Sequence, residues 1–103
     1  MKKPVHPGQI LKQKIDELNL SVMEFTSHMK TSSSQLFYII SGKRVRGSNK
    51  KMYDIRITTK LALKLADALK TTPQFWLELQ MNYDVYQALK THKKIKPVKA
   101  KVK

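Results

Sequence analysis

Apolar residues recur every three or four positions through most of the chain, which is the spacing of a helix with one buried face. Five such stretches are separated by short polar segments, so the pattern predicts an all-α domain with five helices. The expected buried positions are Ile10, Leu11, Ile15 and Leu18; Val22, Phe25 and Met29; Leu36, Ile39 and Ile40; Leu61, Ala62, Leu65, Ala66 and Leu69; and Phe75, Trp76, Leu79, Tyr83 and Tyr86.

Residues that favour helix ends lie where these stretches begin and stop. The segments Ser21 to Glu24 and Ser32 to Gln35 both have the spacing of a capping box, in which two side chains bond reciprocally to the backbone. Proline suits a first helical turn because its missing amide hydrogen has no partner there. The other predicted end residues are Pro7, Thr58 and Thr72-Pro73 at helix starts, and Gly42 at the end of the third helix.

The segment from Leu20 to Arg44 is predicted to form a helix-turn-helix unit. Its two short helices are joined by residues 29–31, a turn of the length that such units use. An ordinary antiparallel helix pair would have the same caps, so this segment alone leaves both interpretations open. In the helix-turn-helix interpretation the base-reading residues at the start of the second helix are Ser33, Ser34, Gln35 and Tyr38.

Lys30 occupies a turn position that many such units fill with glycine. The backbone there often takes a left-handed conformation, which costs a residue with a Cβ atom about 1 kcal/mol. We expect Lys30 to adopt that conformation.

A basic polar segment, residues 43–51, directly follows the predicted recognition helix. Residues 52–57 partly alternate between polar and apolar, so the segment is interpreted as an exposed loop or as a basic hairpin arm ending near Ile57. A solvated loop that contacts nothing is the alternative. The position of the segment favours contact with DNA phosphates, and the predicted DNA-backbone residues are Ser32, Lys43, Arg44, Arg46, Lys50 and Lys51.

Composition and charge narrow the function classes. The chain has 103 residues, no cysteine and a formal net charge of +14, which favours a polyanionic partner. No apolar run reaches the roughly 18 residues of a membrane span, so we expect a cytoplasmic protein without a membrane partner. The expected organisation is one domain, residues 1–90, and a Lys-rich disordered tail, residues 91–103.

The sequence offers little for catalysis. His6, His28 and His92 fall in three separate segments, and no Gly-rich phosphate loop, metal-ligand cluster or nucleophile motif is present. We therefore expect neither an enzyme, such as a small basic ribonuclease, nor a cofactor or metal site. General binding of RNA or other anions through the tail is expected only as an accessory property.

Several segments resemble HigA-type (VapI-related) antitoxins. His6 to Leu11 is similar to the HPGEIL opening of that family, and Ser32 to Arg44 is similar to its recognition helix and the closing turn. Ala62 to Leu69 and Thr72 to Asp84 resemble the last two helices of the family, and the second of these segments, TPQFWLELQMNYD, is the most specific. The resemblance covers roughly residues 5–88.

The resemblance implies a lambda-repressor-like fold and a homodimer that binds a palindromic operator. It further implies repression of the protein's own operon and direct neutralisation of a ribosome-dependent, mRNA-cleaving ribonuclease toxin. A stand-alone helix-turn-helix repressor without a toxin is the alternative. The family pattern places Ser32 to Gln35 and Tyr38 at DNA-reading positions, and Lys43 and Arg44 at the phosphate backbone. Independently, the last helix carries an aromatic stripe at Phe75, Trp76, Leu79, Tyr83 and Tyr86. Such a stripe is usually core, but it is more aromatic than one face of a small domain requires, so part of it is expected to form a dimer or partner interface.

The chain departs from the family pattern in three respects. Lys30 replaces the usual turn glycine, and Val45 to Arg56 forms a basic insertion before helix four. The net charge is also more positive than antitoxins generally carry, so a basic toxin would have to bind through apolar and local polar contacts.

Overall fold

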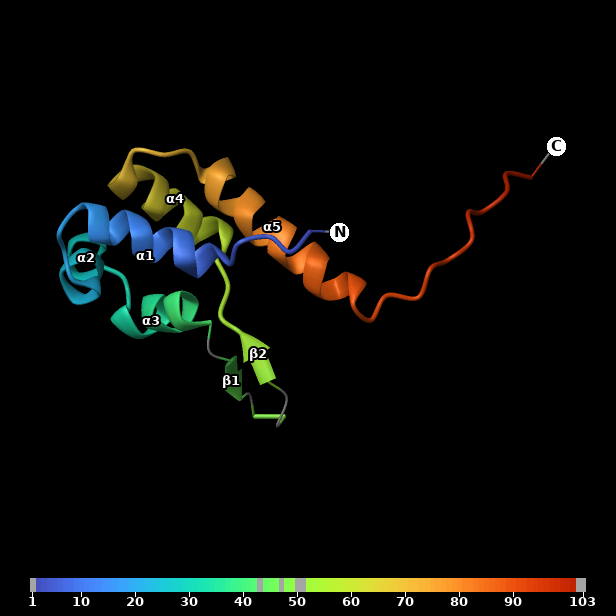
Figure 1. Ribbon diagram of the computed structural model, residues 1–103, viewed down its shortest axis with the longest axis horizontal. Coiled ribbons are helices and arrows are strands. Elements are labelled where there is room, and N and C mark those ends of the chain that lie inside the picture. The colour runs from blue at the N-terminus through green and yellow to red at the C-terminus, as the bar shows by residue number, and fades with distance from the viewer. Residues whose placement is uncertain (1, 43, 47, 50–51, 102–103) are drawn as a thin grey trace.

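The computed structural model describes residues 2–42, 44–46, 48–49 and 52–101. The predicted five helices are confirmed, and a small two-stranded sheet lies between the third and the fourth. α4 packs against α5, and α1 packs against both α3 and α5. Figure 1 shows the hairpin projecting from the helical body and α5 continuing beyond the other helices. The elements are α1 (Pro7–Glu17), α2 (Val22–Met29), α3 (Ser33–Ser41), β1 (Arg44–Arg46), β2 (Met52–Asp54), α4 (Thr59–Leu69) and α5 (Pro73–Leu89).

The core lies where the apolar faces of the five helices meet. Most of the predicted positions are buried or packed against the core, but Leu18 is half exposed because α1 has ended at Glu17 and Leu18 only caps it. Ile57, which was expected near the end of a basic arm, is instead a core residue. The buried cluster consists of Leu11, Ile15, Val22, Phe25, Leu36, Ile39, Ile57, Leu61, Ala62, Leu65 and Trp76.

α1 and α3 approach each other closely at Gly8. A Cβ atom at this position would lie 2.0 Å from the backbone oxygen of Ile39, a distance that no side chain tolerates. Glycine therefore permits the backbone contact, and Leu36 and Ile39 are consequently buried at this junction.

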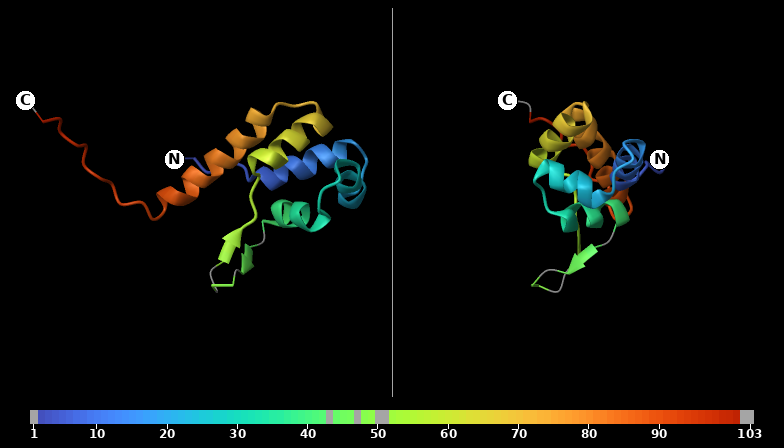
Figure 2. Two further views of the ribbon diagram at one scale, coloured as in Figure 1. Left: turned by 180° about the vertical axis from the view of Figure 1, so that it is seen from behind. Right: turned by 90° about the vertical axis from the view of Figure 1, so that its left-hand side faces the viewer.

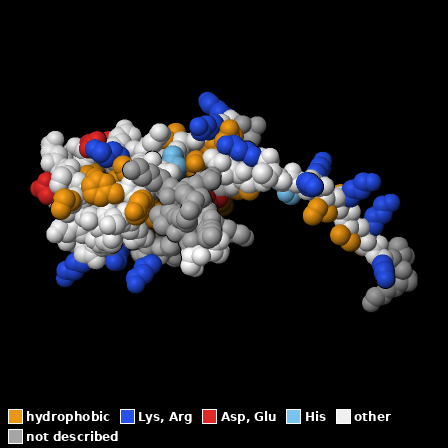
Figure 3. Space-filling view, turned by 90° about the horizontal axis from the view of Figure 1, so that it is seen from below, with side chains coloured by type: hydrophobic (Ala, Val, Ile, Leu, Met, Phe, Trp, Pro, Cys, Tyr) orange, Lys and Arg blue, Asp and Glu red, His pale blue; other side chains and the backbone are white. Residues whose placement is uncertain are grey.

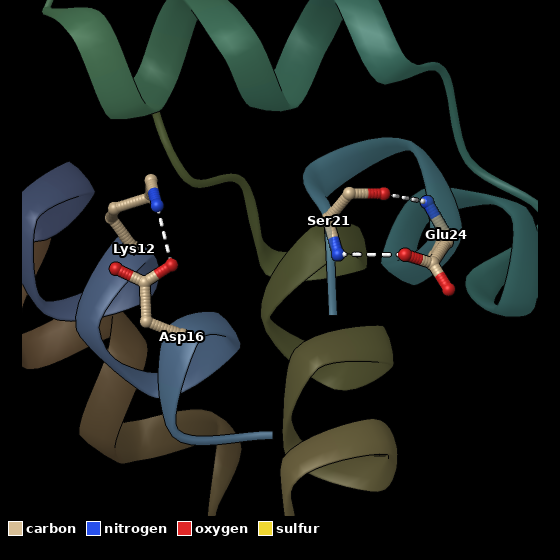
Figure 4. A network of polar contacts seen from close by, with 4 residues as sticks. All are labelled: Lys12, Asp16, Ser21 and Glu24. Atoms are coloured by element: carbon tan, nitrogen blue, oxygen red, sulfur yellow. Dashed lines mark hydrogen bonds and ion pairs between the residues drawn. The ribbon is translucent and has the colours of Figure 1, made fainter. Parts of the chain in front are cut away.

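Polar side chains cap most of the helices as predicted. The Ser21–Glu24 capping box is formed by two reciprocal hydrogen bonds of 3.1 Å, shown in Figure 4 beside the Lys12–Asp16 ion pair on α1. The backbone N–H of Ser21, followed by its hydroxyl, holds the pKa of the Glu24 carboxyl below its ordinary value. Hydroxyl groups of Thr58 and Thr72 accept from the backbone of Leu61 and Phe75, both at 3.2 Å. At α1 the cap is His6, whose Nδ1 accepts from Gly8 N at 2.9 Å.

The second predicted capping box is wrong. Ser32 is the N-cap residue of α3, but its side chain makes no capping hydrogen bond. The Ser32 side chain is exposed and Gln35 is turned towards a groove beside α4, so the reciprocal pair does not form.

The basic insertion forms a β-hairpin, in which β1 at its start pairs with β2 near its end. β1 and β2 are antiparallel, with Arg44 opposite Asp54 and Arg46 opposite Met52, which confirms the hairpin interpretation over the loop. β2 ends three residues before Ile57. The chain beyond β2 then re-enters the helical body, as both views in Figure 2 show.

Gln80 of α5 anchors the segment that follows the hairpin. Its side chain is buried, and Oε1 accepts the backbone N–H of Ile57 at 2.8 Å. Its Nε2 donates to Asp84 Oδ1 at 3.0 Å, and Asp84 in turn forms an ion pair with Arg56. Because an unpaired buried amide is costly, this network fixes where the chain rejoins the core.

Residues 93–101 of the predicted tail contain no helix or strand, and residues 91–101 are all exposed. In the described part of the chain, each helix is too short or too polar to cross a membrane.

Lys30 has the expected left-handed backbone, with φ 55° and ψ 45°. Asn19 and Lys70 share this conformation at the ends of α1 and α4, and Gly42 adopts it after α3. Among these four residues, only Gly42 avoids the cost of a Cβ atom.

Replacement of Lys30 by glycine should raise the stability of the domain. Relief of the left-handed strain is worth about 1 kcal/mol, less a smaller loss through the more flexible unfolded chain. Because about 1 kcal/mol shifts the melting temperature of a domain of this size by about 4–8 °C, the smaller net gain should raise it by less than that, measurable by circular dichroism. Lys30→Ala is the matched control, since it removes the same charge and keeps Cβ. A glycine variant that melts no higher than the alanine variant would contradict this explanation.

Candidate nucleic-acid interface

α2 and α3 form the predicted helix-turn-helix arrangement. After α2, the left-handed Lys30 reverses the chain, and the backbone N–H of Thr31 donates to Thr26 O at 3.1 Å. α3 then turns Leu36 and Ile39 into the core. The opposite side of α3 is therefore exposed to solvent over its whole length.

The exposed side of α3 is called its outer face here and consists of Ser34, Phe37, Tyr38 and Ser41. These residues line a shallow hollow of about 350 Å³. Phe37 is 49% exposed and Tyr38 is 39% exposed, which is unusual for large apolar side chains next to each other on one helix. Figure 3 views this side of the molecule and shows hydrophobic side chains gathered over α3, with Lys and Arg side chains beside them.

A second surface, the lysine groove, lies where α3 and α4 begin. It has a volume of about 220 Å³ and is lined by Lys30, Thr31, Ser32, Gln35, Thr58, Lys60, Leu61 and Lys64. Lys64 Nζ donates to Thr31 Oγ1 at 3.1 Å, which ties α4 to the turn between α2 and α3. The positive dipole ends of two helices add to the charge of three lysines, so the groove suits an anion such as a phosphate.

The structure divides the predicted base-reading residues between these two surfaces. Ser34 and Tyr38 lie on the outer face, whereas Gln35 lines the lysine groove with Ser32. Ser33 is half buried and lines neither surface. A helix turns about 100° per residue, so neighbouring positions 34 and 35 point in different directions.

The predicted DNA-backbone residues are only partly placed. Lys43, Lys50 and Lys51 lie outside the described residues. Arg44 and Arg46 are described as positions in β1, without their side chains. Ser32 is exposed at the edge of the lysine groove.

Sequence reasoning missed Phe37 and the lysines of α4. Phe37 lies off the apolar period of α3, next to Leu36, and this mismatch was the available signal. Lys60 and Lys64 are four residues apart and hence on the same side of α4, but their approach to the α2–α3 turn is a tertiary contact. No local pattern encodes that approach.

The aromatic residues of α5 also divide into core and surface. Trp76 is completely buried, and its Nε1 donates to Thr71 Oγ1 at 2.8 Å, so its side chain offers no surface for a partner. Tyr83 packs edge-on against the His6 ring, with 4.6 Å between ring centroids. Phe75 is partly exposed beneath Lys14, and Leu79 and Tyr86 are half buried. Further exposed apolar residues of α5 are Met81, Val85 and Leu89.

The histidines occupy separate elements of the fold. His6 caps α1, His28 lies in the last turn of α2, and His92 follows α5. Within residues whose placement is described, no three potential ligands among His, Asp and Glu gather as a metal site requires.

Comparisons with known proteins place this geometry in a family. The uncharacterised HTH-type transcriptional regulator YddM of Escherichia coli K12 is 32% identical over 85 residues, which cover 82% of this chain and 79% of that protein. An addiction-module antidote protein of the HigA family from Coxiella burnetii has a solved structure with 32% identity and a TM-score of 0.70, with 86% of each chain covered. The chain belongs to the HigA-type family of helix-turn-helix antitoxins.

A second HigA structure includes DNA. Antitoxin HigA of Pseudomonas aeruginosa, solved with the higBA promoter, is 25% identical to this HigA-type chain, with a TM-score of 0.68 and 84% of each chain covered. No protein-family model matches the chain. The helix-turn-helix interpretation of α2 and α3 is therefore confirmed over that of an ordinary helix pair.

Proposed function

We propose that this HigA-type protein is the antitoxin of a type II toxin–antitoxin pair. It binds operator DNA as a homodimer, represses its own operon and neutralises an mRNA-cleaving toxin by direct contact. One observation carries the DNA-binding part of this proposal. The outer face of α3 and the lysine groove lie side by side, so an apolar and hydroxyl-bearing surface adjoins a cationic one.

That pairing matches the surface of duplex DNA. An α-helix fits the major groove, whose base edges present hydrogen-bonding groups and thymine methyl groups. With α3 in the groove, Lys30, Lys60 and Lys64 lie beside the helix, where the phosphate backbone runs. The net charge of +14 strengthens this attraction on any sequence, so preference for an operator must come from α3.

The homodimer is proposed to form through α5. Its partly exposed residues Phe75, Leu79, Tyr83 and Tyr86 lie on the same helix as Met81, Val85 and Leu89, which leave apolar surface in solvent. Burial of such a surface is the main driving force for association. Antitoxin HigA of Pseudomonas aeruginosa was solved with the higBA promoter, which supports operator binding for this chain as well.

A stand-alone repressor is the second candidate. The relative YddM is named only as a transcriptional regulator, and both surfaces on α3 would serve a repressor without a toxin.

Specific binding to DNA upstream of the protein's own gene tests the shared part of both candidates. The purified protein is titrated into that duplex and into a scrambled duplex across a salt series. We expect a preference for the upstream duplex on the order of 10³ or more near physiological salt. Equal, steeply salt-dependent binding to both duplexes would refute specific repression.

Two variants should separate base reading from phosphate binding. Gln35→Ala is expected to cost about 1–3 kcal/mol on the operator and little on scrambled DNA, if the carboxamide reaches a base edge. Lys60→Ala should weaken binding to both duplexes and reduce the slope of log affinity against log salt concentration by about one unit. Lys70→Ala is the matched control, because Lys70 follows the far end of α4 and should change the slope less. Equal losses for Gln35→Ala on both duplexes would assign Gln35 to the backbone.

Co-expression with the neighbouring reading frame tests whether that frame encodes a toxin that this protein neutralises. We expect that frame to arrest growth when expressed alone, this protein to restore growth, and the two chains to co-purify. Growth arrest that this protein does not relieve, or a neighbour without toxicity, would favour the stand-alone repressor.

A further inference from the structure

Phe37 is exposed without an evident role in folding. It belongs neither to the buried cluster nor to the partly buried residues packed against that cluster, within the described ranges. Half of the side chain is accessible to solvent at the middle of the outer face. Contact of a large apolar side chain with water is unfavourable, and Phe37 lies beside a second exposed ring, that of Tyr38, so the pair forms a surface suited to contact with another molecule.

The neighbours of Phe37 restrict what that molecule can be. Small hydroxyl side chains, Ser34 and Ser41, line the same hollow, and Tyr38 lies beside them. The lysine groove lies beside this face, along the flank of α3 that carries Gln35, and favours an anionic partner. An apolar protein surface would have to approach past three lysines, whereas DNA is attracted by them.

The major groove of DNA contains one apolar group, the C5 methyl of thymine. The hollow of about 350 Å³ is open and shallow, which suits a small group projecting from a base edge. The hydroxyl of Ser34 can bond to a neighbouring polar base atom or to water, whereas that of Ser41 already donates to the backbone oxygen of Tyr38 at 3.4 Å.

We propose that Phe37, supported by Tyr38, is a specificity-determining residue that packs against thymine methyl groups of the operator. This inference rests on the proposed operator binding and extends it by naming the base feature that α3 selects. The contact favours thymine over cytosine and over uracil, because only thymine carries the methyl group in unmodified DNA. It contributes little on scrambled DNA, where thymines fall at the wrong positions.

The test uses the full chain and two chemically matched duplexes. The upstream duplex protected in footprinting is prepared with thymine and, in a second preparation, with deoxyuracil at every thymine position in both strands. The wild type should bind the uracil duplex more weakly by about fourfold for each buried methyl group. Single thymine-to-deoxyuracil substitutions across the footprint should locate the loss at a few positions.

Variants of Phe37 are compared with the wild type on the same two duplexes. Phe37→Ala should bind the thymine duplex as weakly as the wild type binds the uracil duplex, and should no longer distinguish the two. Phe37→Leu keeps an apolar side chain and should retain part of the discrimination. Ile95→Ala, in the exposed tail, is the matched control and should discriminate as the wild type does. Thermal unfolding establishes whether the Phe37 variants fold. If Phe37→Ala does not fold, the comparison between the two duplexes is made with Phe37→Leu instead.

The outcomes separate this inference from the function on which it depends. If the wild type prefers the upstream duplex over scrambled DNA but binds its thymine and uracil forms equally, the methyl contact is refuted and operator binding stands. Equal discrimination by the wild type and Phe37→Ala also refutes it. If the upstream and scrambled duplexes bind equally, the proposed function itself fails, and this inference fails with it.

Discussion

The close contact between α1 and α3 determines which side of α3 faces solvent. Gly8 lets the backbone of α1 approach the Ile39 carbonyl, and Leu36 and Ile39 fill the space behind that contact. Successive residues of a helix point about 100° apart, so burial of Leu36 and Ile39 leaves the outer face, defined above, on the opposite side. A side chain at position 8 would push α3 outward by more than its packing allows. The composition of the outer face therefore depends on a glycine that lies outside it.

The elements of the fold are encoded locally, but the candidate site is not. The helical period and the Ser21, Thr58 and Thr72 caps identify the helices, because capping depends on residues within one turn. Ser32 fails to form the second box, and Gln35 faces a groove made with α4, which the sequence around residue 35 does not specify. Lys60 and Lys64 reach the same groove through tertiary packing. The burial of Ile57 could not be predicted for a similar reason, since Gln80 of a later helix holds its backbone N–H.

Charge and shape have separate roles in the proposed interface. Three acidic residues with described partners are occupied locally: Asp16 by Lys12, Glu24 by the capping box and Asp84 by Arg56. Among the described residues that line the lysine groove there is no carboxylate. The groove and the basic chain as a whole thus attract any polyanion, and this attraction decreases with salt. The outer face has hydroxyl, aromatic and apolar groups whose contacts depend on base identity and position. In the proposed interface, affinity would come from α4 and the α2–α3 turn, whereas sequence preference would come from α3.

α5 connects the proposed dimer surface to the proposed DNA surface. On one side it has exposed apolar residues. Through Gln80 and Asp84 it also holds Arg56 and Ile57, which directly precede the Thr58 cap of α4. The first turn of α4 in turn carries Lys60 into the groove beside α3. These contacts link α5 to the start of α4, and each buried polar side chain described in the network has a partner. In a homodimer joined through α5, the separation of the two α3 helices would follow from the geometry of α5. Half-site spacing is then a property of α5, whereas base preference is a property of α3.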